Sequence, residues 1–175
     1  MQRRLHIVAT SHHYQLGAGF SFGGFKCTVE DQISFENMLR MLVATESVDA
    51  LAEETNRQAL QEAGTAQSVI EILASELGLR HAFCEPDRLE RTALGIYEEN
   101  SIRLSVFPRK IEESEVQRLV ADSWRLREEE WLRRLEKICA SSILFVCGSS
   151  HVHSFVPRAE KHGFQINVAY ANWEA

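Results

Sequence analysis

Long apolar runs are missing from this sequence, and so are the features that mark export. No stretch approaches the ~18 consecutive apolar residues that a membrane-spanning helix needs. The opening residues, MQRRLHIVATSHH, lack the apolar core of a signal peptide, because only a few apolar residues precede two histidines. We therefore expect neither a membrane span nor secretion.

The sequence also has few cysteines and no excess of positive charge. The four cysteines are scattered and form neither a CxxC pair nor a zinc-binding spacing, so a reducing cytoplasm is the simplest compartment. The net charge is −6, and the basic residues are interleaved with acidic ones, as in RLREEEWLRRLEK at 125–137. A protein that neutralises nucleic-acid phosphates usually carries a basic surface, so no nucleic-acid partner is expected.

What remains is the composition of one ordinary globular domain spanning residues 1–175, with 45% hydrophobic and 25% charged residues. Short apolar runs that read as strands alternate with helical patterns, which predicts an α/β fold with a mainly parallel sheet flanked by helices on both faces. The expected strands are 5–10, 48–53, 81–84, 143–147 and 164–169.

Three helices have clear signals. Thr28 is a plausible N-cap for a helix to about residue 45, Ser68 begins a helix that stops at Gly78, and a long helix is expected over 114–138. Residues 95–110 are ambiguous: they read as a short hairpin or an irregular connection, and IRLSVF within them could add a strand.

Polar side chains follow four of the expected strands, at the edge where open α/β sheets bind ligands. We expect strands 5–10 and 143–147 to be interior. If they are neighbours, the histidines that follow them could share one water, metal ion or substrate. The plain alternative is that loops are polar and that these residues are structural. The candidates are His12 with His13 in reserve, Glu53 or Glu54, Glu85, and His151 after Gly148 with His153 in reserve.

Arg127 interrupts an apolar stripe on the long helix. The stripe includes Val120, Trp124, Trp131 and Leu135, and Arg127 occupies the position between the two tryptophans. A buried guanidinium is costly unless it meets an anion or several acceptors. We predict that Arg127 reaches a carboxylate or a ligand at the carboxyl edge of the sheet; otherwise its long side chain extends to solvent.

The second half of the chain resembles the TraB/Tiki-like superfamily, whose relatives include erythromycin-esterase-like and haem-binding ChaN-like proteins. In that family an arginine on a long helix precedes a strand, a Gly-x-x-His turn and a helix that ends at glycine. The residues that carry the likeness are REEEW (127–131), ILFVCGSSH (143–151) and AEKHGFQINVA (159–169).

The first half carries two further points of likeness. IVATSHH (7–13) is similar to the Gly-x-x-His turn after the first strand of the family, although Ala9 replaces the glycine. VDALAEE (48–54) resembles the second strand, which ends in a functional glutamate, and either Glu53 or Glu54 is the match. The resemblance implies hydrolysis of an ester or peptide bond in some members.

A hydrolase is therefore the favoured function, with a small-molecule or peptide substrate. His12, His151, Glu54 and Glu85 would act as bases or as ligands of a divalent metal ion, and Arg127 would stabilise the developing anion. We expect that replacing His12 or His151 with alanine abolishes activity or ligand binding while leaving the fold intact.

Two alternatives belong to other classes. LGAGFSFGGF (16–25) is glycine-rich, but it lies too far from the strand end and from the next helix for a dinucleotide-binding turn. Residues 17–25 are instead interpreted as a lid, or as an interface for a second copy or another protein. The structural alternative is a loop whose phenylalanines pack on the core. The second alternative is a non-catalytic protein that binds a ligand, metal or haem, or a subunit of a larger assembly.

Overall fold

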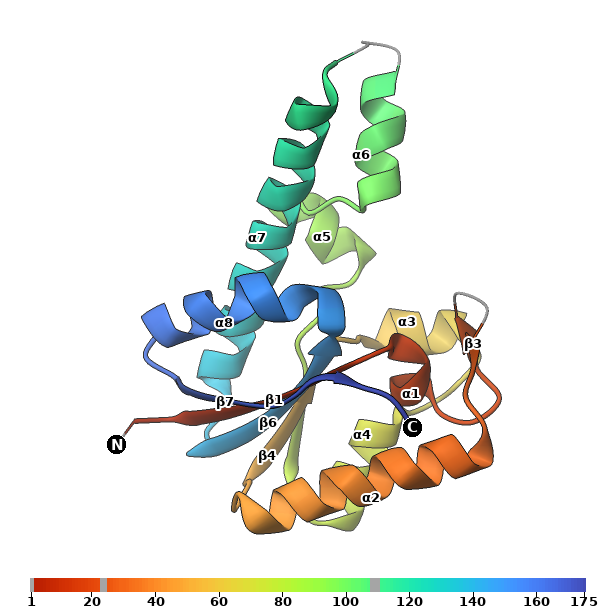
Figure 1. Ribbon diagram of the computed structural model, residues 1–175, viewed down its shortest axis with the longest axis vertical. Helices are drawn as coiled ribbons and strands as arrows, with labels where there is room; N and C mark the ends of the chain where they lie inside the picture. Colours follow the sequence, from red (N-terminus) through yellow and green to blue (C-terminus); the bar gives the residue numbers. More distant parts are fainter. Residues whose placement is uncertain (1, 23–24, 108–110) are drawn as a thin grey trace.

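The fold is built on one sheet of five parallel strands (Figure 1), in a computed structural model that describes residues 2–22, 25–107 and 111–175. Its strand order is β5-β4-β6-β1-β7. The predicted α/β class is confirmed, and the expected strands all form within a few residues of their predicted bounds. They are β1 (Arg4–Thr10), β4 (Ala50–Glu53), β5 (Arg80–Phe83), β6 (Ser142–Gly148) and β7 (Gln165–Trp173).

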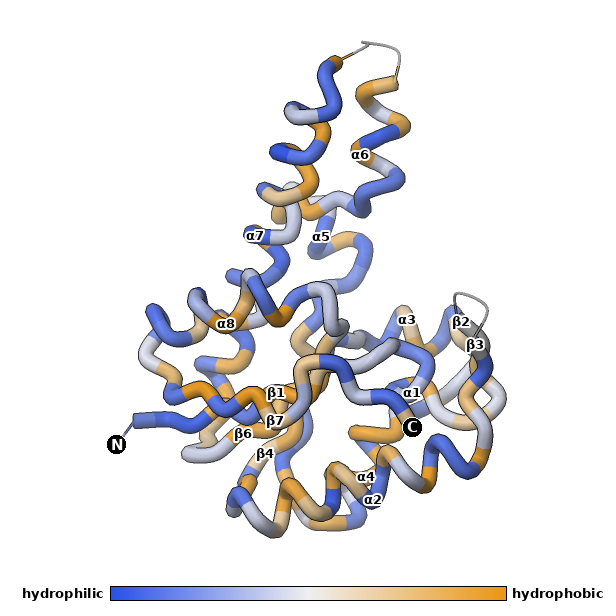
Figure 2. The backbone as a smooth tube through the Cα atoms, viewed as in Figure 1, coloured by the Kyte–Doolittle hydropathy of each residue, from blue (hydrophilic) through white to orange (hydrophobic). Residues whose placement is uncertain are grey.

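Helices cover both faces of the sheet, as expected. On one face, α2 (Val29–Thr45) and α4 (Val69–Glu76) pack against alternate strand residues such as Val8 and Leu51. On the other face, α7 (Glu113–Lys137) and α8 (Val152–Lys161) pack against the intervening ones such as Ala52 and Phe145. Because strand side chains alternate between faces, each strand supplies both cores. In Figure 2 orange, hydrophobic residues gather where β1, β4 and β6 lie.

β1 and β6 are interior neighbours, which confirms the expectation for these two strands. Their register runs from Arg4 opposite Ser142 to Thr10 opposite Gly148, so both strands end at the same level. The chain leaves β1 toward α2 on one face and leaves β6 toward α8 on the other. Such a divergence of connections opens the crevice in which α/β proteins bind ligands.

The predicted helix starts are supported by capping interactions. Thr28 accepts a hydrogen bond from the Asp31 backbone N–H at 3.1 Å, and the Asp31 carboxylate accepts one from the Thr28 N–H at 2.9 Å. Ser68 caps α4 by accepting a hydrogen bond from the N–H of Glu71 at 2.9 Å. These bonds satisfy N–H groups at the helix starts that no helical carbonyl can reach.

Of residues 95–110, the structure describes 95–107, which form neither a hairpin nor a strand, so those interpretations are wrong there. They include α6 (Glu99–Val106), which extends from the body of the protein beside the first half of α7 (Figure 1). Ile102 and Val106 lie one helical turn apart and pack on Val116 and Val120 of α7. The spacing of four was present in the sequence, but the β-branched and aromatic content of IRLSVF concealed it.

Two short antiparallel strands, β2 (Ser21–Phe22) and β3 (Phe25–Lys26), begin within the segment 17–25. Residues 23 and 24 lie outside the described residues. Three further short helices connect the sheet: α1 (His12–Leu16), α3 (Arg57–Glu62) and α5 (Arg88–Leu94). None of the described helices is long and apolar enough to cross a membrane.

Candidate functional site

Arg127 is the centre of the polar cluster at the carboxyl edge of the sheet. Its Nε donates a hydrogen bond of 2.7 Å to Oε2 of Glu85, and its Nη2 lies 2.8 Å from Oε1 of Glu54. Its Nη1 donates a hydrogen bond of 3.5 Å to Nε2 of His151. Each guanidinium nitrogen therefore contacts a residue that follows a different strand, β5, β4 or β6. The predicted contact between Arg127 and a carboxylate is present.

Glu54 is a buried carboxylate whose surroundings favour the anion. Its side chain is 0% exposed, and its Oε2 accepts a hydrogen bond of 2.7 Å from the N–H of Gly148. Burial alone would raise the pKa of Glu54, but Arg127, His12 and His151 outweigh it, and the pKa lies below its ordinary value. We conclude that Glu54 is ionised near neutral pH.

Glu85 has the opposite tendency although it shares the same arginine. Oε2 accepts hydrogen bonds from Arg127 and, at 2.8 Å, from Nε1 of Trp131. Oε1 is buried and accepts no hydrogen bond from the described residues; Nε of Arg91 lies 3.8 Å from it. Burial raises the pKa of Glu85; Arg127 opposes this rise and the charge of Glu54 adds to it.

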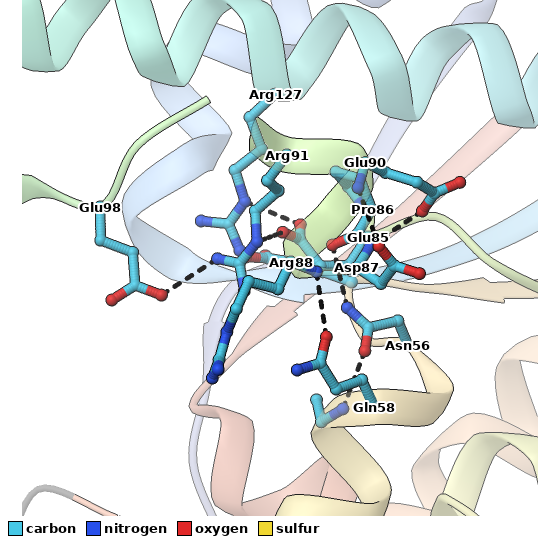
Figure 3. A network of polar contacts seen from close by, with 12 residues as sticks. Asn56, Gln58, Glu85, Pro86, Asp87, Arg88, Glu90, Arg91, Glu98 and Arg127 are labelled. Atoms are coloured by element: carbon cyan, nitrogen blue, oxygen red, sulfur yellow. Dashed lines mark hydrogen bonds and ion pairs between the residues drawn. The ribbon is translucent and has the colours of Figure 1, made fainter. Parts of the chain in front are cut away.

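The contacts of Arg91 extend this network away from the sheet (Figure 3). Nη1 of Arg91 lies 3.1 Å from Oε1 of Glu98, so Arg91 connects Glu98 to Glu85. The network thus contains three carboxylates and two guanidinium groups. A proton on Glu85 would balance its charge, in agreement with the raised pKa of that residue.

His12 is the histidine that opens to solvent at this edge, with a side chain that is 35% exposed. Its Nδ1 lies 2.8 Å from Oε1 of Gln15, and the amide nitrogen of Gln15 donates a hydrogen bond of 3.4 Å to the carbonyl of Val146. This second bond orients the amide so that its oxygen faces His12. His12 therefore carries a proton on Nδ1, and in the neutral ring the lone pair is on Nε2, which lies 3.7 Å from Oε1 of Glu54.

His151 is buried rather than exposed, with 3% of its surface accessible. Its ring lies between Trp124 and Trp131, with centroid distances of 4.8 and 4.7 Å. Its Nε2 is 3.8 Å from Oε1 of Glu54, so His12 and His151 approach the same carboxylate oxygen. The adjacency of the two strands brings the two histidines together, but only His12 has access to solvent.

The histidines held in reserve lie elsewhere. His13 is buried, its Nδ1 forms a 2.8 Å hydrogen bond with Ser11 Oγ, and its ring lies 4.0 Å from that of Tyr14. His153 is exposed on α8. The turn geometry therefore selects His12 and His151.

Glu53 and Glu54 point to opposite faces of the sheet, which decides between them. Glu53 follows the alternation of Leu51 toward α4, where its Oε1 accepts hydrogen bonds from Ser68 Oγ and from His81 Nε2, the latter at 2.7 Å. Glu54 faces α7 and Arg127. Glu53 thus belongs to a separate buried cluster.

A cavity of about 510 Å³ opens over this network. Its polar lining includes Glu54, Glu85, Arg127 and His12, and its apolar lining consists of Leu16, Phe20, Ala59 and Ala63. This volume lies within the usual range for small-molecule sites, which are concave and mostly apolar with a few converging polar groups. His151 is not among the lining residues.

The expected metal ligands do not form a metal site. No group of three or more His, Cys, Asp or Glu side chains among the described residues is arranged to hold a metal ion. Glu54 and Glu85 both contact the guanidinium of Arg127, and a divalent cation placed between these carboxylates would be repelled by it. The donor set therefore does not fit a divalent metal ion.

Gly148 is required here for space rather than for an unusual backbone angle. Its φ is −65°, which any residue adopts, but a Cβ at this position would lie 3.3 Å from both Glu54 Oε2 and His12 Nε2. The glycine lets β6 approach the two side chains closely enough for its N–H to bind Glu54.

Gly148→Ala is expected to destabilise the protein by about 1 kcal/mol through this overpacking and to move the His12 ring. Thermal melting and the imidazole resonances of His12 in NMR spectra would report the two effects. Ser149→Ala, at the next and exposed position, should change neither. An alanine variant with unchanged His12 resonances would show that the space beside Gly148 is not needed.

Gln15 and Glu128, like Arg91 and Glu98, belong to the site but were missed from the sequence. Gln15 lies one turn after His12, and Glu128 directly follows Arg127 and bonds to His151. Glu128 also falls one turn after Trp124, so the spacing that singled out Arg127 marks Glu128 equally. The sequence could therefore have identified Glu128, because it is a second charged residue on the apolar stripe of this helix.

Comparisons with known proteins leave the family undetermined. No family model matches the chain, and neither a curated protein nor a solved structure matches it significantly. The likeness to TraB/Tiki-like proteins therefore stays a prediction.

Proposed function

We propose that the protein is a hydrolase of small ester or peptide substrates and that the reaction takes place in the cavity above Arg127. The observation that carries this proposal is the pair of carboxylates on one guanidinium. The surroundings lower the pKa of Glu54 and raise that of Glu85. Two carboxyl groups whose pKa values are driven apart in one cleft are typical of acid–base catalysis.

His12 is the proposed general base. Its Nε2 would take a proton from a water molecule whose oxygen attacks the substrate carbonyl carbon, and the ionised Glu54 nearby would stabilise the resulting imidazolium. Gln15 supports this role because it keeps the proton of neutral His12 on Nδ1.

Arg127 and Glu85 would complete the reaction. A guanidinium has five N–H groups, so its contacts with Glu54, Glu85 and His151 leave donors for the oxygen that becomes negative. Protonated Glu85 would give its proton from Oε1 to the leaving oxygen or nitrogen as the bond to the carbonyl carbon breaks. The proton on His12 then passes to solvent, and Glu85 regains one from it.

The direct test is hydrolysis of a panel of chromogenic acetyl and butyryl esters and short peptides by the wild-type protein and the His12→Ala variant. Activity that disappears with His12 supports the proposal. Wild-type protein that hydrolyses none of them contradicts it and favours a ligand-binding role for the same cavity.

Glu85→Gln separates catalysis from stability. The amide oxygen can still accept the bonds from Arg127 and Trp131, but it cannot supply the proton, so we expect kcat to fall by about 100-fold or more. The alkaline decline of the wild-type rate, caused by ionisation of Glu85, should also disappear. Glu99→Gln, an exposed carboxylate paired with Arg103, is the control and should leave the rate unchanged.

The stability of the same variant should depend on pH in a defined direction. The folded state raises the pKa of Glu85, so folding favours the protonated carboxyl group. This contribution to the stability of the wild type is fully present below about pH 4, the ordinary carboxyl pKa. It is lost as the pH rises through the raised pKa of the folded protein. Glu85→Gln should therefore melt like the wild type in acid and at a higher temperature than the wild type at neutral pH, because glutamine has no proton to lose. A lower melting temperature at neutral pH would contradict the assignment.

A further inference from the structure

Glu128 is a buried carboxylate that lies behind the site rather than in the cavity. It is 0% exposed and directly follows Arg127 on α7. Its Oε1 accepts hydrogen bonds from His151 Nδ1 at 3.0 Å and from Ser154 Oγ at 2.5 Å, and its Oε2 accepts one from Arg158 Nε at 3.0 Å. A buried anion with three donors is an oriented, fully partnered group.

The proton position on His151 follows from these contacts. An ionised carboxylate can only accept hydrogen bonds, so the Nδ1 of His151 that faces Glu128 must carry a proton. The neutral ring then has a lone pair on Nε2, the atom to which Arg127 Nη1 donates at 3.5 Å. With the other tautomer, two N–H groups would face each other between His151 and Arg127.

We propose that Glu128 is a positioning residue of this site: it fixes the tautomer of His151, and His151 in turn holds the third nitrogen of Arg127. Trp124 and Trp131 on either side of the imidazole prevent the ring from turning away. Glu54 and Glu85 position the other two nitrogens. The kinetic consequence of this arrangement rests on the proposed hydrolase function, whereas the tautomer and the placement of Arg127 do not.

The test exchanges the carboxylate for an amide of the same shape, Glu128→Gln. Because Arg158 can only donate, the amide oxygen should face Arg158 and the amide nitrogen should donate to Nδ1 of His151. The proton of His151 would then move to Nε2. Nitrogen chemical shifts of the imidazole report the tautomer by NMR, and the Nε–H resonance of Arg127 reports the placement of its guanidinium.

Glu129→Gln is the matched control. Glu129 is the next residue on the same helix and lies 3.6 Å from the same Arg158, but it pairs with His162 and not with His151. We expect Glu129→Gln to leave the His151 tautomer and the Arg127 resonance unchanged. Glu128→Gln should alter both and lower kcat by about 100-fold, the effect of an ångström-scale displacement, with KM nearly unchanged.

The outcomes separate this proposal from the proposed function. If His151 keeps its proton on Nδ1 in folded Glu128→Gln, or if the tautomer changes while Arg127 does not move, the proposal is wrong. If the wild type hydrolyses nothing, the two NMR readouts still decide it. Should Glu128→Gln fail to fold, Glu128→Asp is the second variant. It keeps the negative charge for Arg158 but moves the carboxylate oxygen about 1.5 Å away from Nδ1 of His151. A mixture of His151 tautomers in this variant supports the proposal, and an unchanged tautomer overturns it.

Discussion

Replacing Arg127 with methionine is expected to cost about 3–5 kcal/mol of stability, the usual loss when one partner of a buried ion pair is removed. The variant leaves the carboxylate of Glu54 with 0% exposure and that of Glu85 with 6% exposure, and neither then has a guanidinium at hydrogen-bonding distance. Methionine keeps the apolar character of the helix stripe, so the loss reports the charges rather than a cavity. Thermal melting should show a decrease of about 10 °C.

A triple variant distinguishes charge from packing. Arg127→Met combined with Glu54→Gln and Glu85→Gln removes both buried carboxyl groups together with the arginine, and it should recover most of the lost stability. Arg127→Lys should be almost as unstable as Arg127→Met, because an ammonium group cannot reach three acceptors in one plane as a guanidinium does. If Arg127→Met melts within a degree or two of the wild type, the ion pairs contribute nothing and the geometry around Arg127 is incidental.

Alanine substitution of the two site histidines should give opposite results. His12→Ala removes a side chain that is 35% exposed, so we expect a change in stability below about 0.5 kcal/mol and a loss of activity of about 100-fold to 10,000-fold. His151→Ala removes a buried ring bonded to Glu128 and Arg127. It should cost about 2–3 kcal/mol besides lowering activity.

This expectation revises the one from the sequence, in which both histidines could be removed without cost to the fold. The burial of His151 between two tryptophans is the reason for the revision. His153→Ala, two residues further along, is exposed and should melt and react as the wild type does. Equal melting temperatures for His12→Ala and His151→Ala would show that His151 has no role in holding the core.

Much of the fold followed from patterns that act locally. Continuous apolar runs such as 143–147 predict strands covered on both faces, and Thr28 with Asp31 marks a helix start through hydrogen bonds that span only three residues. Arg127 was identified because a charge on a buried stripe requires a partner. The helix α6 was missed because a short segment rich in β-branched and aromatic residues supports either a helix or a strand until it finds a neighbour, here α7.

The sequence by itself determined the fold class, the strand ends that carry polar residues, and the need of Arg127 for an anion. Only the tertiary structure decided which residues meet. The insertion of β6 between β4 and β1 brings Glu54, His12 and His151 together, although they are far apart in the chain. The same packing buries His151 and exposes His12, and it drives the pKa values of Glu54 and Glu85 apart. Burial and the proximity of charges depend on distances between elements, which no local pattern specifies.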